Sequence, residues 1–155
     1  MRIVVLAVGK AAGPEKELCD RYRERAAGLG RQVGVSAVDV LEISDKTGPR
    51  RAAEEGAALL AKVPKGRLIA LDERGKTLTS ERFAGLVQRW MDDGVAAASF
   101  AIGGADGHPP AVRDASHDVI SLSPMTLPHA LARVMVLEQI YRAVTLCAGH
   151  PYHRS

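Results

Sequence analysis

Five times along the chain, a short apolar segment rich in β-branched residues is followed by a longer segment whose apolar residues recur at helical spacing. Residues 2–8, RIVVLAV, are apolar almost throughout, which is typical of a strand covered on both faces. We predict the other strands within residues 32–43, 67–72, 99–104 and 118–123. Because the connections are short, the alternation predicts an α/β fold in which helices cover both faces of a parallel sheet.

The predicted helices have recognisable ends. Pro14 suits the first turn of one helix, Pro128 suits the first turn of the last, and glycines follow the ends of several. The helices are expected at residues 13–30, 52–63, 79–94, 111–116 and from 128 onward. No repeat, linker or low-complexity segment interrupts the pattern, so residues 1–155 are expected to form one domain.

Composition is that of an ordinary water-soluble protein. Hydrophobic residues make up 46% and charged residues 25% of the chain, and no segment approaches the roughly 18 consecutive apolar residues needed to cross a bilayer. The opening MRIVVLAVG lacks the apolar region and cleavage site of a signal peptide, and the two cysteines, Cys19 and Cys147, lie in helix-like segments. We expect a cytoplasmic protein without membrane contact. The net charge of +3 is compatible with a phosphate-rich partner, although no long basic run is present.

Ligands of parallel α/β sheets bind beyond the carboxyl ends of the strands. Three loops are therefore candidates, those that follow Leu71, Gly103 and Ser121. The second contains IGGADG, residues 102–107, whose paired glycines allow close approach of a ligand to the backbone. Its spacing matches neither the dinucleotide-binding nor the P-loop pattern, and a tight strand exit explains the glycines equally well.

The segment SLSPMTLPHALARVMVLEQIYRA, residues 121–143, combines a rigid loop with an unusual helix. Pro124 and Pro128 restrict the loop, so that its backbone groups are held ready for a ligand. The helix has two apolar faces, one formed by Ala130, Val134, Leu137, Tyr141 and Val144 and the other by Val136, Ile140, Ala143 and Cys147. Two apolar faces favour a symmetric dimer contact, and complete burial within one chain is the alternative. Glu138 and Arg142 are spaced for an ion pair, which can be structural or functional.

The last six residues, HPYHRS, are rich in functional side chains for a chain terminus. Zinc binding through Cys147, His150 and His153 is disfavoured, because structural zinc normally has four ligands in paired spacings and Pro151 interrupts them. We expect no metal. Neither G-x-S-x-G nor H-E-x-x-H occurs, so the sequence gives hydrolase chemistry little support.

IGGADG, the 121–143 segment and GHPYHR together resemble the signatures of the small SPOUT-class methyltransferases that modify N3 of a pseudouridine in large-subunit (23S) ribosomal RNA. The resemblance spans the chain, including the opening VVLAVGK and the ALDERGK segment. One departure is Ala105, where the family usually carries proline. The resemblance implies a SPOUT-type α/β fold with a C-terminal trefoil knot, a homodimer, and S-adenosylmethionine bound by the three loops.

The resemblance also implies roles for particular residues. The cofactor would contact Leu71, Gly103, Gly104 and the loop formed by Ser123, Pro124, Met125, Thr126, Leu127 and Pro128. Methylation at N3 requires loss of the ring proton, for which His153 can serve as base or donor. Arg154 can neutralise an anion or hold a phosphate, Tyr152 can stack on a base, and Arg142 can steady the pocket or RNA. We expect the tail of one subunit to complete the cofactor pocket of the other.

Other interpretations stay open from sequence alone. The tail can instead cap the last helix and pack on the core, because cationic groups suit helix C-termini. The whole chain can be a non-catalytic RNA-binding or ribosome-associated module, given its basic pI near 9.1. A nucleotide-binding oxidoreductase is disfavoured by the failed dinucleotide fingerprint. For the methyltransferase, the small charge excess favours the assembled ribosome over naked RNA as substrate.

Overall fold

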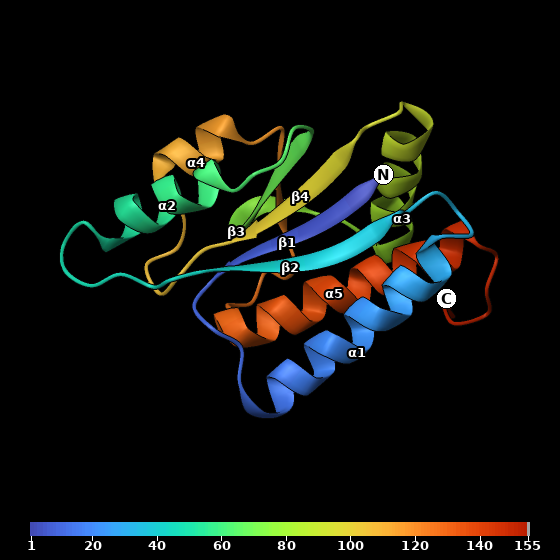
Figure 1. Ribbon diagram of the computed structural model, residues 1–155, viewed down its shortest axis with the longest axis horizontal. Helices are drawn as coiled ribbons and strands as arrows, with labels where there is room; N and C mark the ends of the chain where they lie inside the picture. The colour runs from blue at the N-terminus through green and yellow to red at the C-terminus, as the bar shows by residue number, and fades with distance from the viewer. Residues whose placement is uncertain (155) are drawn as a thin grey trace.

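The computed structural model describes residues 1–154 and contains a five-stranded parallel sheet with helices on both faces (Figure 1). The strand order is β2-β1-β4-β3-β5. The strands are β1 (Arg2–Val8), β2 (Ala37–Ile43), β3 (Arg67–Thr77), β4 (Ala97–Ile102) and β5 (Asp118–Ser121). The helices are α1 (Gly13–Gly30), α2 (Arg51–Ala61), α3 (Ser80–Asp92), α4 (Pro110–Ala115) and α5 (His129–Cys147). The predicted α/β fold and its order of elements are confirmed.

Central strands β1 and β4 are buried over almost their whole length, because helices cover both of their faces. Alternate residues of β1 enter two separate cores, with Ile3 and Val5 in one and Val4 and Leu6 in the other. Helices α1, α3 and α5 cover the first core, whereas α2 and α4 cover the second (Figure 1). Two-sided burial thus explains why RIVVLAV lacks the polar alternation of a half-exposed strand.

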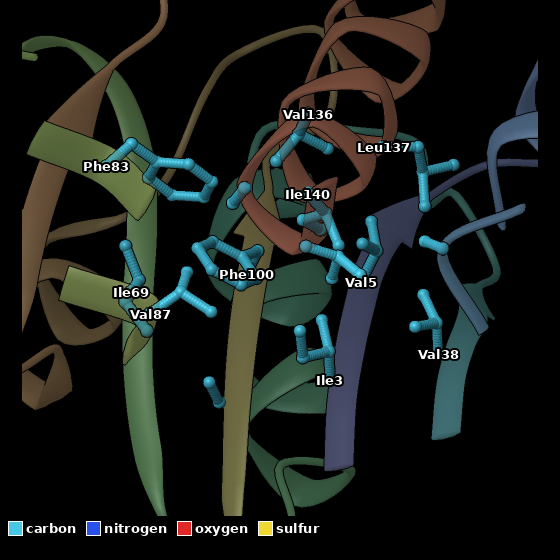
Figure 2. Packing of buried hydrophobic residues seen from close by; sticks show 14 of the residues in the cluster. Ile3, Val5, Val38, Ile69, Phe83, Val87, Phe100, Val136, Leu137 and Ile140 are labelled. Carbon is cyan, nitrogen blue, oxygen red and sulfur yellow. The ribbon is translucent and has the colours of Figure 1, made fainter. Parts of the chain in front are cut away.

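The larger core is organised around the aromatic ring of Phe100 on β4. This ring lies 5.7 Å from the ring of Phe83 and 6.2 Å from that of Trp90, measured between centroids, and both partners come from α3. Figure 2 shows Val136 and Ile140 of α5 approaching the same ring from above the sheet. The core therefore fixes α5 relative to the strands that end at the candidate site.

Both apolar faces of α5 are buried within the single chain. The helix lies between α1 and α3 on the sheet (Figure 1), so Leu137 and Val144 on one face and Val136 and Ile140 on the other are at most 1% exposed. The two-face argument for a dimer contact is therefore wrong, and burial within the chain is the correct interpretation. The large apolar side chains that α5 does expose are Leu131 and Met135, one turn apart.

Strand β3 departs from regular pairing near its carboxyl end. Leu71 and Lys76 both pair with Ile120 of β5, so residues 72–75 leave the ladder between them. A Cβ atom on Gly75 would lie 2.7 Å from backbone atoms of Val119 and Ile120, which explains the glycine. This excursion places Asp72 and its neighbours beside the candidate site. Within residues 1–154, no helix is both long and apolar enough to span a membrane.

Candidate ligand-binding cavity and C-terminal cluster

A cavity of about 380 Å³ lies at the carboxyl ends of β3, β4 and β5. Its walls are residues 71–74, 102–108, 121–123 and 125–127, together with His129 and Ala132 at the beginning of α5. These are the three loops that the topology of a parallel sheet predicts as ligand-binding. The volume falls within the range of about 300–1,000 Å³ that is typical of small-molecule sites.

The glycine turn forms one wall of the cavity with bare backbone. The Gly107 N–H donates to the Gly104 carbonyl oxygen at 2.9 Å, which closes a turn with Ala105 and Asp106 at its corner. A Cβ on Gly103 would lie 2.7 Å from the carbonyl carbon of Gly107, so no larger residue fits there without moving the backbone. Ala105 occupies the turn position that proline favours, and the turn closes without proline.

The loop that precedes α5 is held by its own hydroxyl groups. Ser121 Oγ donates to the Ser123 carbonyl oxygen at 2.7 Å, and Ser123 Oγ accepts from the Met125 N–H at 2.9 Å. Thr126 Oγ1 donates to Glu73 Oε2 at 3.1 Å, which ties this loop to the β3 excursion. Two of the three walls are thus linked by a side-chain hydrogen bond.

Most of the residues predicted to contact a cofactor line this cavity. They are Leu71, Gly103, Gly104, Ser123, Met125, Thr126 and Leu127. Pro124 and Pro128 belong to the same loop but are not among the lining residues; Pro128 is the N-cap of α5. The two prolines therefore restrict the backbone of the loop without lining the cavity themselves.

Several polar residues of the cavity, among them Asp72, Arg74 and His108, are not among the site residues predicted from sequence. The Arg74 guanidinium donates to Asp72 and lowers the pKa of that carboxyl group to about 2, although its burial acts in the opposite direction. His108 is 6% exposed, and its Nε2 lies 2.9 Å from the Ala101 carbonyl oxygen. Burial lowers the pKa of His108, which favours a neutral ring. The sequence offers only a weak indication of these residues: Asp72 directly follows a buried strand segment, and His108 directly follows the glycine turn.

The C-terminal tail forms a second cluster around the carboxylate of Glu138 on α5. Arg142 Nη2 and Tyr152 Oη donate to Glu138 Oε1 at 2.6 and 3.1 Å. The Tyr152 ring packs on that of Tyr141 with centroids 4.7 Å apart, and the Arg142 guanidinium lies 5.0 Å from the Tyr152 ring centroid. Burial, reinforced by the hydrogen bond to Glu138, raises the pKa of Tyr152 to about 12.

His153 joins this cluster through both ring nitrogens. Its Nδ1 lies 3.2 Å from Arg142 Nη1, and its Nε2 lies 2.8 Å from Glu81 Oε1. Because a guanidinium only donates, Nδ1 accepts, and the ring proton of neutral His153 is placed on Nε2, which donates to Glu81. Arg154 is exposed. The structure therefore brings Arg142, Tyr152 and His153 together and leaves Arg154 in solvent.

Gly149, rather than the PYHR segment, terminates α5. Gly149 has a φ of +66°, its N–H donates to the Leu146 carbonyl oxygen at 3.2 Å, and the His150 N–H donates to that of Thr145 at 2.9 Å. This is a Schellman arrangement, which satisfies the last carbonyl groups with backbone alone. The alternative prediction that the tail caps α5 is therefore not met, because Gly149 ends the helix. The tail does pack on α5, as that alternative also predicts.

Arg133 and Gln139, two further polar residues of α5, have structural partners. Arg133, 3% exposed, donates to Glu42 Oε2 at 2.7 Å and to the Gly9 carbonyl oxygen at 2.9 Å, which anchors the loop after β1. Gln139 accepts from Ser80 Oγ at 2.7 Å. No group of three or more histidine, cysteine, aspartate or glutamate side chains within residues 1–154 is arranged to hold a metal ion.

The cavity lies at the beginning of α5, whereas the tail cluster contacts the second half of the helix, from Glu138 to Arg142. Ala132, which lines the cavity, and Arg142, which contacts His153, are ten residues apart on α5, which corresponds to about 15 Å at 1.5 Å per residue. One chain therefore does not bring His153 to its own cavity. The two groups of predicted site residues are each assembled, but separately.

Fold and cavity together define an α/β protein with a candidate ligand site at the carboxyl edge of its sheet. The family described as "Predicted SPOUT methyltransferase" matches residues 1–153, and the chain belongs to this family of methyl-transferring enzymes. The name "Ribosomal RNA large subunit methyltransferase H" is carried by a Rhodopseudomonas palustris protein that is 50% identical over 160 residues, covering 100% of both chains. A Nitrobacter winogradskyi protein of the same name is 50% identical over 159 residues, covering 99% of each.

A solved structure supports the fold. The probable methyltransferase from Bordetella pertussis Tohama I aligns with a TM-score of 0.55 at 17% identity, covering 92% of this chain and 94% of that one. At this level of identity the likeness concerns the arrangement of strands and helices. The predicted family membership is confirmed by the family match and by the full-length relatives.

Proposed function

We propose that this methyltransferase transfers the methyl group of S-adenosylmethionine to N3 of a pseudouridine in large-subunit (23S) ribosomal RNA. The observation that carries the proposal is the cavity whose walls are the three loops predicted to bind the cofactor. The full-length identity of 50% to proteins named as large-subunit rRNA methyltransferases supports the RNA substrate. The choice of N3 of pseudouridine follows from the family that the sequence motifs resemble.

The residues of the cavity fit the cofactor. A Cβ on Gly103 would meet the backbone of Gly107, and one on Gly104 would meet Glu55, so this wall stays free of those side chains and its backbone N–H and C=O groups can hydrogen-bond the edge of a purine. When bound, S-adenosylmethionine supplies an electrophilic methyl group on a positively charged sulfur. The prolines behind the loop and the Thr126–Glu73 hydrogen bond hold the walls in place, which reduces the ordering that binding requires.

The chain's own task is to orient the base and to accept the N3 proton. In His153, Nδ1 carries the free lone pair of the neutral ring and is engaged by Arg142. Arg142 must therefore leave Nδ1 before the N3–H group can donate to it. Tyr152 offers a ring for stacking on the base, and the exposed Arg154 can bind a phosphate group. Glu81, which accepts from Nε2, stabilises the imidazolium formed by this proton transfer.

A homodimer is part of the proposal, because the tail of one chain lies far from its own cavity. The tail of a second chain, with α5 oriented in the opposite direction, would deliver His153 to the cavity of the first. The exposed apolar side chains Met125, Leu131 and Met135, which are 77%, 45% and 42% exposed, lie in the loop and first turns of α5 beside the cavity. A second copy covering them would remove apolar surface from water.

Mixed dimers test this composite site. Variants altered at His153 and at Gly104 are each expected to be inactive, and their mixture should recover activity, because one site of each heterodimer contains neither change. A mixture that stays inactive after subunit exchange has been verified would contradict a shared site. The matched control is a mixture of two His153 variants, which should remain inactive.

We further propose that the C-terminal third forms the trefoil knot implied by the resemblance. The close approach of Gly75 to the backbone of β5, and the pairing of Ile120 with both Leu71 and Lys76, support a threaded arrangement at this point. An experimental backbone trace tests it directly. The segment that contains β5 and α5 should pass through the loop formed by the preceding strand and its connection, and an unthreaded path would refute the knot.

The activity is tested by mass-spectrometric mapping of ribosomal RNA after incubation with the protein and isotopically labelled S-adenosylmethionine. A single added methyl group on a pseudouridine of 23S RNA is expected, with faster modification of intact ribosomes than of an isolated stem-loop. Equilibrium binding of S-adenosylmethionine separates this function from a non-catalytic RNA-binding module. A protein that binds ribosomes but not the cofactor would establish the module instead.

A further inference from the structure

Helix α2 contacts the glycine turn at two places and the adjoining N-cap of α4 at a third. Arg51 forms a two-pronged ion pair with Asp106, at 2.6 and 2.7 Å. Four residues later, one helical turn along the same face, Glu55 contacts Gly104. Gly56 packs against Pro109 so closely that a Cβ on it would lie 2.3 Å from Pro109 Cγ. The turn thus faces the cavity on one side and rests on α2 on the other.

Glu55 is the unusual member of this contact, because a carboxylate is expensive to bury without partners. The residue is 4% exposed. Its Oε1 accepts from the Lys46 N–H at 3.0 Å, and its Oε2 faces Gly104, where an added Cβ would lie 2.4 Å away. One side chain therefore joins the loop after β2 to the turn that lines the cavity.

The Arg51–Asp106 ion pair beside Glu55 restrains the turn less strongly. The side chains of Arg51 and Asp106 are 36% and 51% exposed, so water and salt screen their attraction. Glu55 is shielded from solvent and makes its contact at the first residue of the turn proper. The depth at which Gly104 sits is consequently set by the length of the Glu55 side chain and by its hydrogen bond to Lys46.

We propose that Glu55 is a positioning residue that holds the glycine turn in the shape that accepts the methyl donor. The inference rests on the proposed use of S-adenosylmethionine in the adjacent cavity. Glu55 acts through Gly104 and is not among the residues that line the cavity. Its contribution is to limit the movement of the turn before binding, so that less order has to be acquired when the cofactor binds.

The test compares Glu55→Ala and Glu55→Gln with a control, Glu54→Gln, at the exposed neighbouring position on the same helix. Calorimetric titration should show S-adenosylmethionine binding weakened by about tenfold or more in Glu55→Ala. Glu55→Gln keeps an oxygen for Lys46 and the same length, so its affinity should stay within about threefold of the unaltered protein. Glu54→Gln should bind as the unaltered protein does.

A second measurement uses no cofactor. Hydrogen exchange at the Gly107 N–H, which bonds to the Gly104 carbonyl oxygen, should accelerate in Glu55→Ala and stay unchanged in Glu54→Gln. Exchange in β1 should not change in either variant, which separates a local effect on the turn from loss of the fold. Unchanged exchange at Gly107 together with unchanged affinity in Glu55→Ala would overturn the inference.

A double substitution keeps the test decisive if Glu55→Ala is poorly folded. Gly104→Ala places a methyl group against Oε2 of Glu55, and removal of that carboxylate makes room for it. Gly104→Ala combined with Glu55→Ala should therefore bind the cofactor more tightly than Gly104→Ala alone. Equal or weaker binding by the double variant counts against the contact. Failure of the unaltered protein to bind S-adenosylmethionine would instead refute the proposed function.

Discussion

Replacement of Gly103 by alanine should destabilise the protein, in contrast to the usual effect of removing a glycine. The new Cβ would lie 2.7 Å from the Gly107 carbonyl carbon and 3.0 Å from the His108 nitrogen. Both obstacles are backbone atoms, so the clash is relieved only by a shift of about 0.7 Å between the two sides of the turn. Forced overpacking of this kind costs about 2 kcal/mol, which lowers the Tm by about 4–8 °C for a domain of this size.

Gly85→Ala provides the matched control. Gly85 lies within α3, where an added Cβ meets nothing within 4 Å. Alanine should stabilise this helix by about 0.5–1 kcal/mol and raise the Tm by about 1–4 °C. Thermal melting followed by calorimetry or circular dichroism under the same conditions shows whether the Tm falls in Gly103→Ala and rises in Gly85→Ala, relative to the unaltered protein. A Gly103→Ala protein that melts at or above the unaltered protein would refute the argument that the turn admits no side chain.

Three further predictions concern single groups. Because the folded pKa of Asp72 is lowered from 3.8 to about 2 by Arg74, its ionised form stabilises the protein above pH 4 and loses that effect as the pH falls through 2. The Tm difference between the unaltered protein and Asp72→Asn should therefore be constant above pH 4 and shrink below it, and a difference that grows on acidification would contradict this. Tyr152, held protonated by burial and Glu138, should titrate near pH 12, and Tyr152→Phe should remove this late step from the ultraviolet absorbance titration. Phe100→Ala should cost about 3–5 kcal/mol in denaturant unfolding, and a loss below 1 kcal/mol would refute the central place of that ring in the core.

The sequence was most informative where one physical rule determines the outcome. Two-sided burial makes a strand continuously apolar, so β1 and β4 were recognised, and the edge of a parallel sheet determined which loops meet. The excursion of β3 at residues 72–75 was not predictable, because it depends on the pairing of Ile120 with two separate positions. For the same reason Asp72 was read as the end of a strand rather than as a residue of the cavity.

The candidate site was predicted in parts rather than in arrangement. Motifs identify the glycine turn and the tail, but only the path of α5 shows that the cavity adjoins the first turns of this helix and the tail its second half. The two apolar faces of α5 were interpreted as evidence for a dimer, since the sequence does not reveal that α1 and α3 flank it. Glu55 escaped notice because a single glutamate in a helix is normally solvent-exposed.

The Schellman ending at Gly149 has a consequence for how the last residues can be used. Since the backbone up to His150 satisfies the terminal carbonyl groups there, α5 keeps its full length whether residues 151–154 rest on it or reach outward. Detachment breaks only the ring packing on Tyr141 and a few polar contacts at Glu138, Arg142 and Glu81. The C-terminal tail can therefore leave α5 and bind another surface by rotation near Gly149, without any unwinding of the helix.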